Sequence, residues 1–210
     1  MADLAALQAA IEAGDRATAV AITTAAVAEG ADPRAVLDAM TAAMEVIGQK
    51  FACNEIYVPE MLISARAMKE ATAVLEPVLV AADIRPEHTA VIGTIKGDLH
   101  DIGKNLVGMM WKGANIEVVD LGTNVSPEAF VAAAREHGAS LVGVSALLTT
   151  TMVGMKDVVA AVRAASLPGV KVIVGGAPVT AEYAASIGAD GYAPDAASAV
   201  QIAKSAVGMA

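Results

Sequence analysis

A histidine flanked by carboxylates lies near the middle of the chain, in the segment Gly97-Asp98-Leu99-His100-Asp101-Ile102-Gly103. Histidine is the commonest metal-ligand side chain, and a ligating imidazole usually needs an acceptor on its other nitrogen to fix its tautomer. Asp98, two residues before His100, is well placed to be that acceptor. By itself this short motif is more typical of a histidine at a helix start than of a metal ligand. Whether His100 is a ligand must therefore be judged from the elements around it.

The elements around the histidine place it at the end of a strand. Residues 89–95 form an apolar, β-branched run that predicts a buried strand, and residues 106–111 continue as a helix. In open α/β sheets, ligands bind at such strand-to-helix turns, at the carboxyl ends of parallel strands. We therefore expect His100 to face a ligand crevice.

Three further turns follow predicted strands and should line the same crevice. Residues 145–151 are rich in hydroxyl groups, Gly175 and Gly176 would admit a flat group against the backbone, and residues 192–196 form the last turn. Taken singly, a Gly-Gly pair is ordinary turn geometry and a Ser/Thr run is ordinary helix capping. No dinucleotide fingerprint and no phosphate loop follows any strand, which argues against those two ligand classes.

The chain changes character near residue 81. Up to that point apolar residues recur at helical spacing in four segments, with helix-start signals at Asp15, Asp32-Pro33 and Pro59. We predict a four-helix bundle over residues 1–82 and a linker over the polar, proline-bearing residues 83–88.

Residues 89–210 alternate between strand and helix patterns. The predicted strands are 90–95, 116–120, 141–145, 170–174 and 191–193, and the predicted helices begin near Asp101, Ser126, Thr151, Thr180 and Asp195. This alternation predicts an α/β fold with a parallel, five-stranded, flavodoxin- or Rossmann-like sheet and flanking helices.

Composition narrows the function classes. The chain has 210 residues, is 56% hydrophobic and carries a formal net charge of −9, which argues against a nucleic-acid partner. The single cysteine, Cys53, excludes an internal disulfide and fits a reducing compartment. The sequence after Met1 enters an amphipathic pattern directly, and no apolar run is long enough to span a bilayer. We expect a cytoplasmic protein without a membrane partner.

In order along the chain, Asp98-x-His100-x-x-Gly103, Ser145-x-Leu147 and Gly175-Gly176 resemble the cobalamin-binding signature of methionine synthase and of small corrinoid proteins. The resemblance covers essentially the whole chain, because residues 57–69 look like part of the helical cap domain of those proteins. The nearest resemblance is to the corrinoid protein of three-component methyltransferase systems, which act on methanol, methylamines or methoxylated aromatics.

This resemblance implies that cobalamin or a related corrinoid is bound base-off and His-on, with His100 as the lower cobalt ligand. Asp98 would hold the imidazole and share its proton, and Thr151, where methionine synthase carries a serine, would complete the relay. Tyr57 and Met61 would cover the upper face. The other implied cofactor contacts are Gly97, Leu99, Asp101, Ile102, Gly103, Ser145, Leu147, Thr149, Gly175, Gly176, Tyr192, Ala193, Asp195 and Ala196.

The resemblance also implies a methyl carrier that is not catalytic alone. Cobalt(I) would take a methyl group from a substrate-specific methyltransferase as methylcobalt(III). A second methyltransferase would pass the group to tetrahydrofolate or to a thiol such as coenzyme M, and a reductive activase is the third implied partner. The helical cap would swing aside on residues 81–88 to admit these enzymes.

Three alternatives stay open at this point. The cobalamin subunit of a radical mutase shares the Asp-x-His-x-x-Gly pattern but generally lacks the helical cap. A cobalamin-dependent regulator would need an added DNA-binding module. A flavodoxin-like module without a corrin would be colourless. The sequence leaves the methyl donor and the methyl acceptor undetermined.

Overall fold

The chain divides into two compact units. In the computed structural model, which describes residues 3–209, the first unit runs to Pro86 and includes Gly113–Asn115, and the second comprises Glu87–Lys112 and the residues from Ile116 onward. Within residues 3–209, no helix combines the length and the apolar composition needed to cross a membrane.

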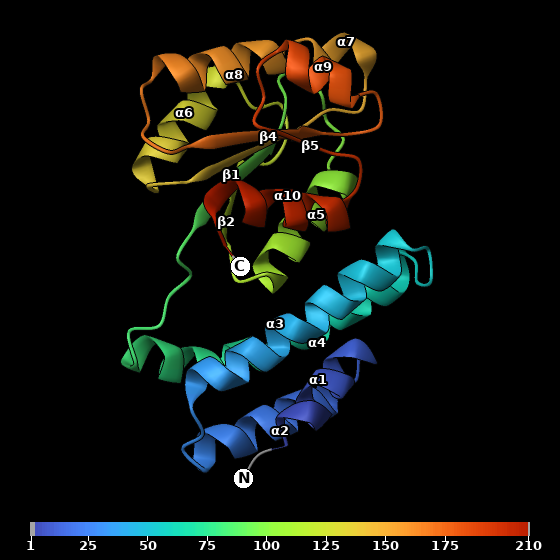
Figure 1. Cartoon of the computed structure of the whole chain (residues 1–210), viewed down its shortest axis with the longest axis vertical. Helices are drawn as coiled ribbons and strands as arrows, with labels where there is room; N and C mark the ends of the chain where they lie inside the picture. The colour runs from blue at the N-terminus through green and yellow to red at the C-terminus, as the bar shows by residue number, and fades with distance from the viewer. Residues whose placement is uncertain (1–2, 210) are drawn as a thin grey trace. The chain divides into compact units, whose positions relative to one another are not determined.

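Residues 3–86 of the first unit fold into four helices (Figure 1): α1 (Leu4–Glu12), α2 (Arg16–Ala28), α3 (Pro33–Ala52) and α4 (Val58–Ala81). Three aspartates, Asp3, Asp15 and Asp32, cap the first three helices by accepting a hydrogen bond from a backbone amide of the first turn. The helices bury apolar side chains, among them Leu7, Ile11, Met40, Ile47, Met61 and Leu75. The predicted helical N-terminal region is confirmed.

The second unit is built on a parallel sheet. Its strands are β1 (Thr89–Thr94), β2 (Glu117–Asp120), β3 (Leu141–Ser145), β4 (Lys171–Gly175) and β5 (Gly191–Ala193). All neighbouring strands pair in parallel, in the order β2-β1-β3-β4-β5, which is the flavodoxin-like order. The predicted five-stranded parallel sheet is therefore confirmed.

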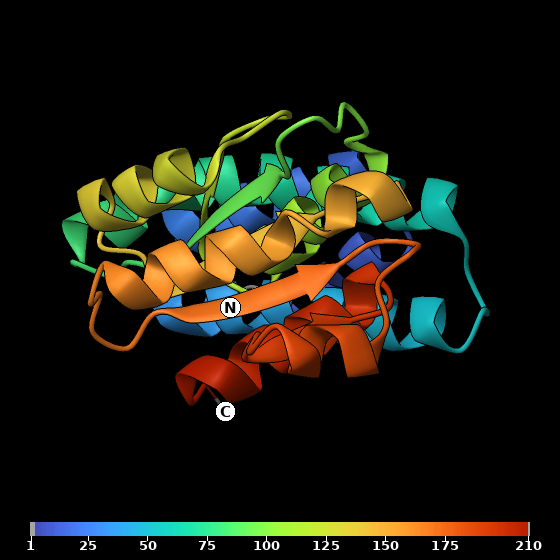
Figure 2. The same cartoon turned by 90° about the horizontal axis from the view of Figure 1, so that it is seen from above.

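Helices cover both faces of this sheet. They are α5 (Ile102–Gly113), α6 (Pro127–Glu136), α7 (Thr149–Met152), α8 (Met155–Ala164), α9 (Ala181–Ser186) and α10 (Ala196–Val207). Helices α6 and α8 lie side by side on one face, and α5 and α10 lie on the other (Figures 1 and 2). The indole Nε1 of Trp111 in α5 donates to the Ala199 carbonyl of α10 over 3.0 Å, which ties the second pair together.

One predicted helix is divided in two in the structure. The helix expected to begin near Thr151 is two helices, a short α7 that begins at Thr149 and α8 that begins at Met155. Between them Gly154 passes close to Ile95, the residue that follows β1, because a Cβ on Gly154 would lie 3.3 Å from Ile95 Cγ1. Thr151 therefore lies inside α7, whereas we expected it to begin a helix.

The order of the strands creates the crevice that the sequence predicted. The chain goes from β1 to β2 on one side and later returns with β3 on the other side of β1. The connections that leave β1 and β3 consequently lie on opposite faces of the sheet, and ligands bind at such switch points. The His100 segment follows β1, and Thr151 follows β3.

Candidate functional site

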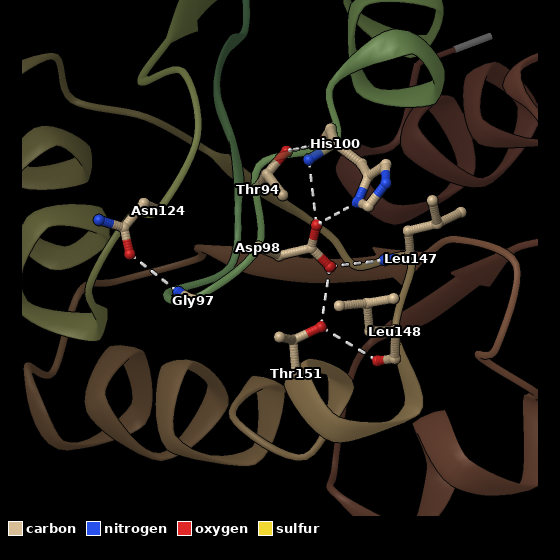
Figure 3. Close-up of polar contacts among 8 residues, drawn as sticks. All are labelled: Thr94, Gly97, Asp98, His100, Asn124, Leu147, Leu148 and Thr151. Atoms are coloured by element: carbon tan, nitrogen blue, oxygen red, sulfur yellow. Dashed lines mark hydrogen bonds and ion pairs between the residues drawn. The ribbon is translucent and has the colours of Figure 1, made fainter.

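His100 and Asp98 form a hydrogen-bonded pair in the loop after β1. The Nδ1 atom of His100 lies 2.9 Å from Asp98 Oδ1, and the backbone N–H of His100 donates to the same oxygen over 3.0 Å (Figure 3). Because a carboxylate only accepts, Nδ1 carries the proton of this contact, and in the neutral form of the ring the lone pair is then on Nε2. Within residues 3–209, Nε2 has no hydrogen-bond partner, and 56% of the His100 side chain is exposed.

The second oxygen of Asp98 connects the β1 loop to the segment after β3. Asp98 Oδ2 accepts hydrogen bonds from the Leu147 backbone N–H and from Thr151 Oγ1, each over 2.8 Å (Figure 3). Burial of this carboxyl by itself raises its pKa, but the hydrogen bonds from Leu147, His100 and Thr151 outweigh burial and hold the pKa of Asp98 well below its ordinary range. Asp98 is therefore ionised at neutral pH.

Hydrogen bonds between side chains and backbone fix the loop that carries the pair. The hydroxyl of Thr94, the buried last residue of β1, donates to the His100 carbonyl over 2.8 Å. On the other side, Gly97 N–H donates to Asn124 Oδ1 over 2.8 Å (Figure 3). Gly97 has a φ of 85°, in the left-handed region that favours glycine, so this residue type is needed to turn the chain.

Exposed apolar side chains lie on the two segments that hold the pair. Leu99 is 74% exposed, Ile102 81% and Leu147 43%, although each is large and hydrophobic. Leu99 and Ile102 lie within two residues of His100 in the chain, and the Leu147 N–H binds the carboxylate of Asp98. These three predicted contacts therefore offer an apolar surface beside the exposed edge of His100.

The predicted glycine pair has a constraint that sequence reasoning missed. A Cβ on Gly175 would lie 2.7 Å from the Ala193 carbonyl oxygen, and one on Gly176 would lie 1.9 Å from the Ala146 carbonyl oxygen. Gly176 also has a φ of 121°. The two glycines let neighbouring backbones approach each other, and their contact with a flat ligand stays a prediction.

The remaining predicted contacts are distributed around the same ends of the strands. Asp101 accepts from the Asn105 side chain over 3.1 Å, and Asp195 caps α10 by accepting from the Ser198 N–H over 2.7 Å. Ser145 ends β3, Thr149 begins α7, Gly103 lies in the first turn of α5, Tyr192 and Ala193 lie in β5, and Ala196 begins α10. Tyr57 and Met61 belong to the first unit, so their place over the site stays a prediction.

The donor set of the site restricts what metal it could hold. Within the described residues 3–209, there is no group of three or more His, Cys, Asp or Glu side chains that could hold a metal ion. His100 offers one nitrogen beside an apolar surface. A single imidazole in such surroundings fits a metal that arrives with its other ligands in a flat organic ring, because protein-only sites use three or four side chains.

Comparison with known proteins decides the family. A model described as the B12 binding domain matches residues 88–201, and a second model of the same description matches residues 4–76. A corrinoid protein of Desulfitobacterium hafniense is 41% identical over 169 residues, which are 79% of this chain and 78% of that protein. The chain belongs to the corrinoid proteins of methyltransferase systems. The resemblance stated from the sequence is confirmed, and cobalamin or a related corrinoid is the cofactor of this corrinoid protein.

Further relatives and solved structures agree. Trimethylamine corrinoid protein 2 of Methanosarcina acetivorans is 40% identical over 186 residues, 87% of this chain and 86% of that one. A cobalamin-binding protein from Desulfitobacterium hafniense superposes with a TM-score of 0.82 at 28% identity, over 99% of this chain and all of that one. The methanol:cobalamin methyltransferase complex MtaBC from Methanosarcina barkeri gives a TM-score of 0.86 at 28% identity, over 98% of this chain and 79% of that one.

Proposed function

We propose that this corrinoid protein carries a methyl group on cobalt and that His100 is the lower cobalt ligand, with the cofactor's own base displaced. The observation that carries the proposal is the exposed Nε2 of His100, whose ring is held through Nδ1 by a buried carboxylate 2.9 Å away. A ligating histidine is typically oriented in this way. The corrinoid supplies the cobalt that accepts and releases the methyl group.

Asp98 and Thr151 would set the proton balance of the ligand. If His100 held the cobalt through Nε2, Asp98 would keep the ring proton on Nδ1. If His100 detached, Asp98 would still hold its ring through Nδ1, and the buried carboxylate would stabilise a positive charge on that ring. Thr151 Oγ1 lies 2.8 Å from Asp98 Oδ2 and 3.0 Å from the Leu148 carbonyl, and its one proton serves either acceptor. Thr151 thus adjusts how strongly Asp98 attracts the ring proton.

The displaced nucleotide tail would enter between the ends of β3, β4 and β5. We assign it the predicted contacts Ser145, Leu147, Thr149, Gly175 and Gly176, with residues 192–196 beside its base. The positions of these contacts support this path, because Ser145 ends β3 and Gly175 ends β4, so they lie at the same edge of the sheet. The upper face would be covered by Tyr57 and Met61 from the helical cap. We assign the cap to residues 1–82 and the linker to residues 83–88, with the hinge over residues 81–88.

The partners follow from the role of a carrier. A substrate-specific methyltransferase would load the methyl group, a second methyltransferase would move it to tetrahydrofolate or coenzyme M, and a reductive activase would restore the reduced cofactor. The solved complex of methanol:cobalamin methyltransferase supports the first partner, and relatives named for trimethylamine and dimethylamine support methylated amines as further donors. The docked methyltransferase selects the donor. We place this exchange in the cytoplasm.

Reconstitution with hydroxocobalamin tests the proposal. The full-length protein should bind it with a visible spectrum unlike that of the free cofactor, and His100→Ala should lose the histidine-ligated spectrum. His137→Ala is the matched control, because His137 ends α6 and is exposed. A parent spectrum that His100→Ala leaves unchanged would contradict the assignment of the ligand, and a parent protein that binds no cobalamin would contradict the function.

A further inference from the structure

The connection between β2 and α6 lies against the loop that carries His100. Asp98, two residues before the proposed ligand, accepts at its backbone carbonyl from Asn124 N–H over 3.0 Å. Gly97 N–H in turn donates to the Asn124 side-chain oxygen over 2.8 Å (Figure 3). One residue of the neighbouring connection therefore holds two consecutive residues of the ligand loop, through one backbone bond and one side-chain bond.

The conformation of Asn124 makes this double contact possible. Its φ of 57° lies in the left-handed region, which asparagine tolerates better than most residues other than glycine. In that conformation its backbone N–H and its side-chain carbonyl both reach the ligand loop. An aliphatic side chain would be strained there and would leave Gly97 N–H without this acceptor.

The connection is itself anchored on both sides. Lys104, a lysine only 2% exposed, donates from Nζ to both carboxylate oxygens of Asp120 and, over 2.6 Å, to Asn105 Oδ1. Asp120 Oδ1 also accepts from Gly122 N–H over 2.8 Å, and the Gly122 carbonyl accepts from Thr94 N–H over 2.9 Å. Asn124 thus projects from a segment held by an ion pair, whose lysine is buried and whose aspartate is partly exposed, and by β1.

We propose that Asn124 is a positioning residue for the cobalt ligand, which acts through Gly97 and Asp98 to fix the direction in which His100 presents Nε2. The inference rests on the proposed role of His100. The carboxylate of Asp98 holds the His100 imidazole, so any movement of the Asp98 backbone would change the orientation of the ring. Asn124 restricts this movement in the apoprotein, so less conformational entropy is lost when the cofactor binds.

Two substitutions separate the side-chain acceptor from the backbone conformation. Asn124→Gly keeps the left-handed backbone and its N–H but loses Oδ1, and Asn124→Asp keeps an acceptor for Gly97 N–H. Asn54→Gly is the matched control, because Asn54 is an exposed asparagine with a φ of 58° in the first unit. Asn54→Gly reproduces the loss of stability that a new glycine causes, and it leaves the loop that carries His100 unchanged.

Two readouts are needed. In the full-length apoprotein, Asn124→Gly should speed amide hydrogen exchange at residues 97–100 selectively and broaden the imidazole nitrogen signals of His100. Loss of one hydrogen bond predicts hydroxocobalamin affinity about threefold to tenfold weaker, with a smaller histidine-ligated fraction in the visible spectrum. Asn124→Asp should restore both properties to within about twofold of the parent, a margin of about 0.4 kcal/mol.

Unchanged exchange at residues 97–100 together with unchanged affinity in Asn124→Gly would overturn the proposal. So would a uniform rise in exchange across the second unit, or an equal change in Asn54→Gly, because either would reveal a general effect on stability. The exchange measurement needs no cofactor. It therefore tests the hold on the loop even if His100→Ala contradicts the proposed ligand.

Discussion

Thr151 and His100 bind opposite oxygens of one buried carboxylate. Thr151 Oγ1 lies 2.8 Å from Asp98 Oδ2, and His100 Nδ1 lies 2.9 Å from Asp98 Oδ1. The loop after β1 and the helix after β3 are therefore joined by a single side chain, as Figure 3 shows. A change at Thr151 can reach the imidazole through Asp98, which makes the two positions testable as one unit.

Replacement of Thr151 separates its hydroxyl from its shape. Thr151→Val keeps the volume and removes the donor to Asp98, so it should lower the free energy of unfolding of the second unit by about 1 kcal/mol. Thr151→Ser keeps the hydroxyl and should stay within about 0.5 kcal/mol of the parent. Fluorescence of Trp111, the only tryptophan, follows urea unfolding of this unit from inside its core. Equal losses in both variants would show that the hydroxyl contributes nothing.

Acid should weaken the second unit through Asp98. Its pKa is lower in the folded protein than in the unfolded chain, so the ionised carboxylate stabilises the fold above the unfolded pKa of about 4, and this stabilisation is lost as pH falls below it. Asp98→Asn puts an amide among hydrogen-bond donors and should cost about 1–3 kcal/mol at neutral pH. The gap between parent and variant should shrink progressively below about pH 4 in unfolding curves of the apoprotein. If the difference in unfolding free energy between the parent and Asp98→Asn stayed the same from neutral pH to strong acid, this account would be contradicted.

The glycine pair after β4 should be intolerant of substitution for reasons of backbone packing. Gly176→Ala places a methyl 1.9 Å from the Ala146 carbonyl oxygen at a φ of 121°, and we expect a loss of about 3 kcal/mol or more in unfolding free energy. Gly188→Ala is the control, since Gly188 has a φ of 75° and open space around its Cα, and should cost about 1 kcal/mol. Similar losses in the two variants would disprove the packing argument.

The fold was predictable because its signals are local. Apolar runs between turn residues, most of them β-branched, located the five strands, and Leu141–Ser145 and Gly191–Ala193 have the predicted bounds. Aspartates ahead of apolar periodicity located the starts of α2 and α3, where Asp15 and Asp32 do cap the helices. The break at Gly154 was missed because it arises from close approach to Ile95, a contact between elements distant in sequence.

The site was predictable only in part. The spacing of Asp98 and His100 identified their pairing, because two residues suffice to bring a carboxylate back to an imidazole in one loop. The Leu147 amide, Thr94 and Asn124 were not identified as supports, although all three bind the loop or its carboxylate. A backbone amide has no sequence signature, and the other two contacts depend on how loops after different strands meet.

The central claim is that the nitrogen bound to cobalt comes from His100 and not from the cofactor's own base. Isotope labelling of histidine tests this claim most directly. The protein would be produced with ¹⁵N-histidine, loaded with unlabelled cobalamin and reduced to cobalt(II), and its electron paramagnetic resonance spectrum recorded beside that of unlabelled protein. If His100 ligates cobalt, the superhyperfine pattern of the axial nitrogen changes from a triplet to a doublet on labelling, and His100→Ala abolishes the doublet. A triplet that persists in the labelled protein would mean that the cofactor's own base still holds the metal, and would contradict the account.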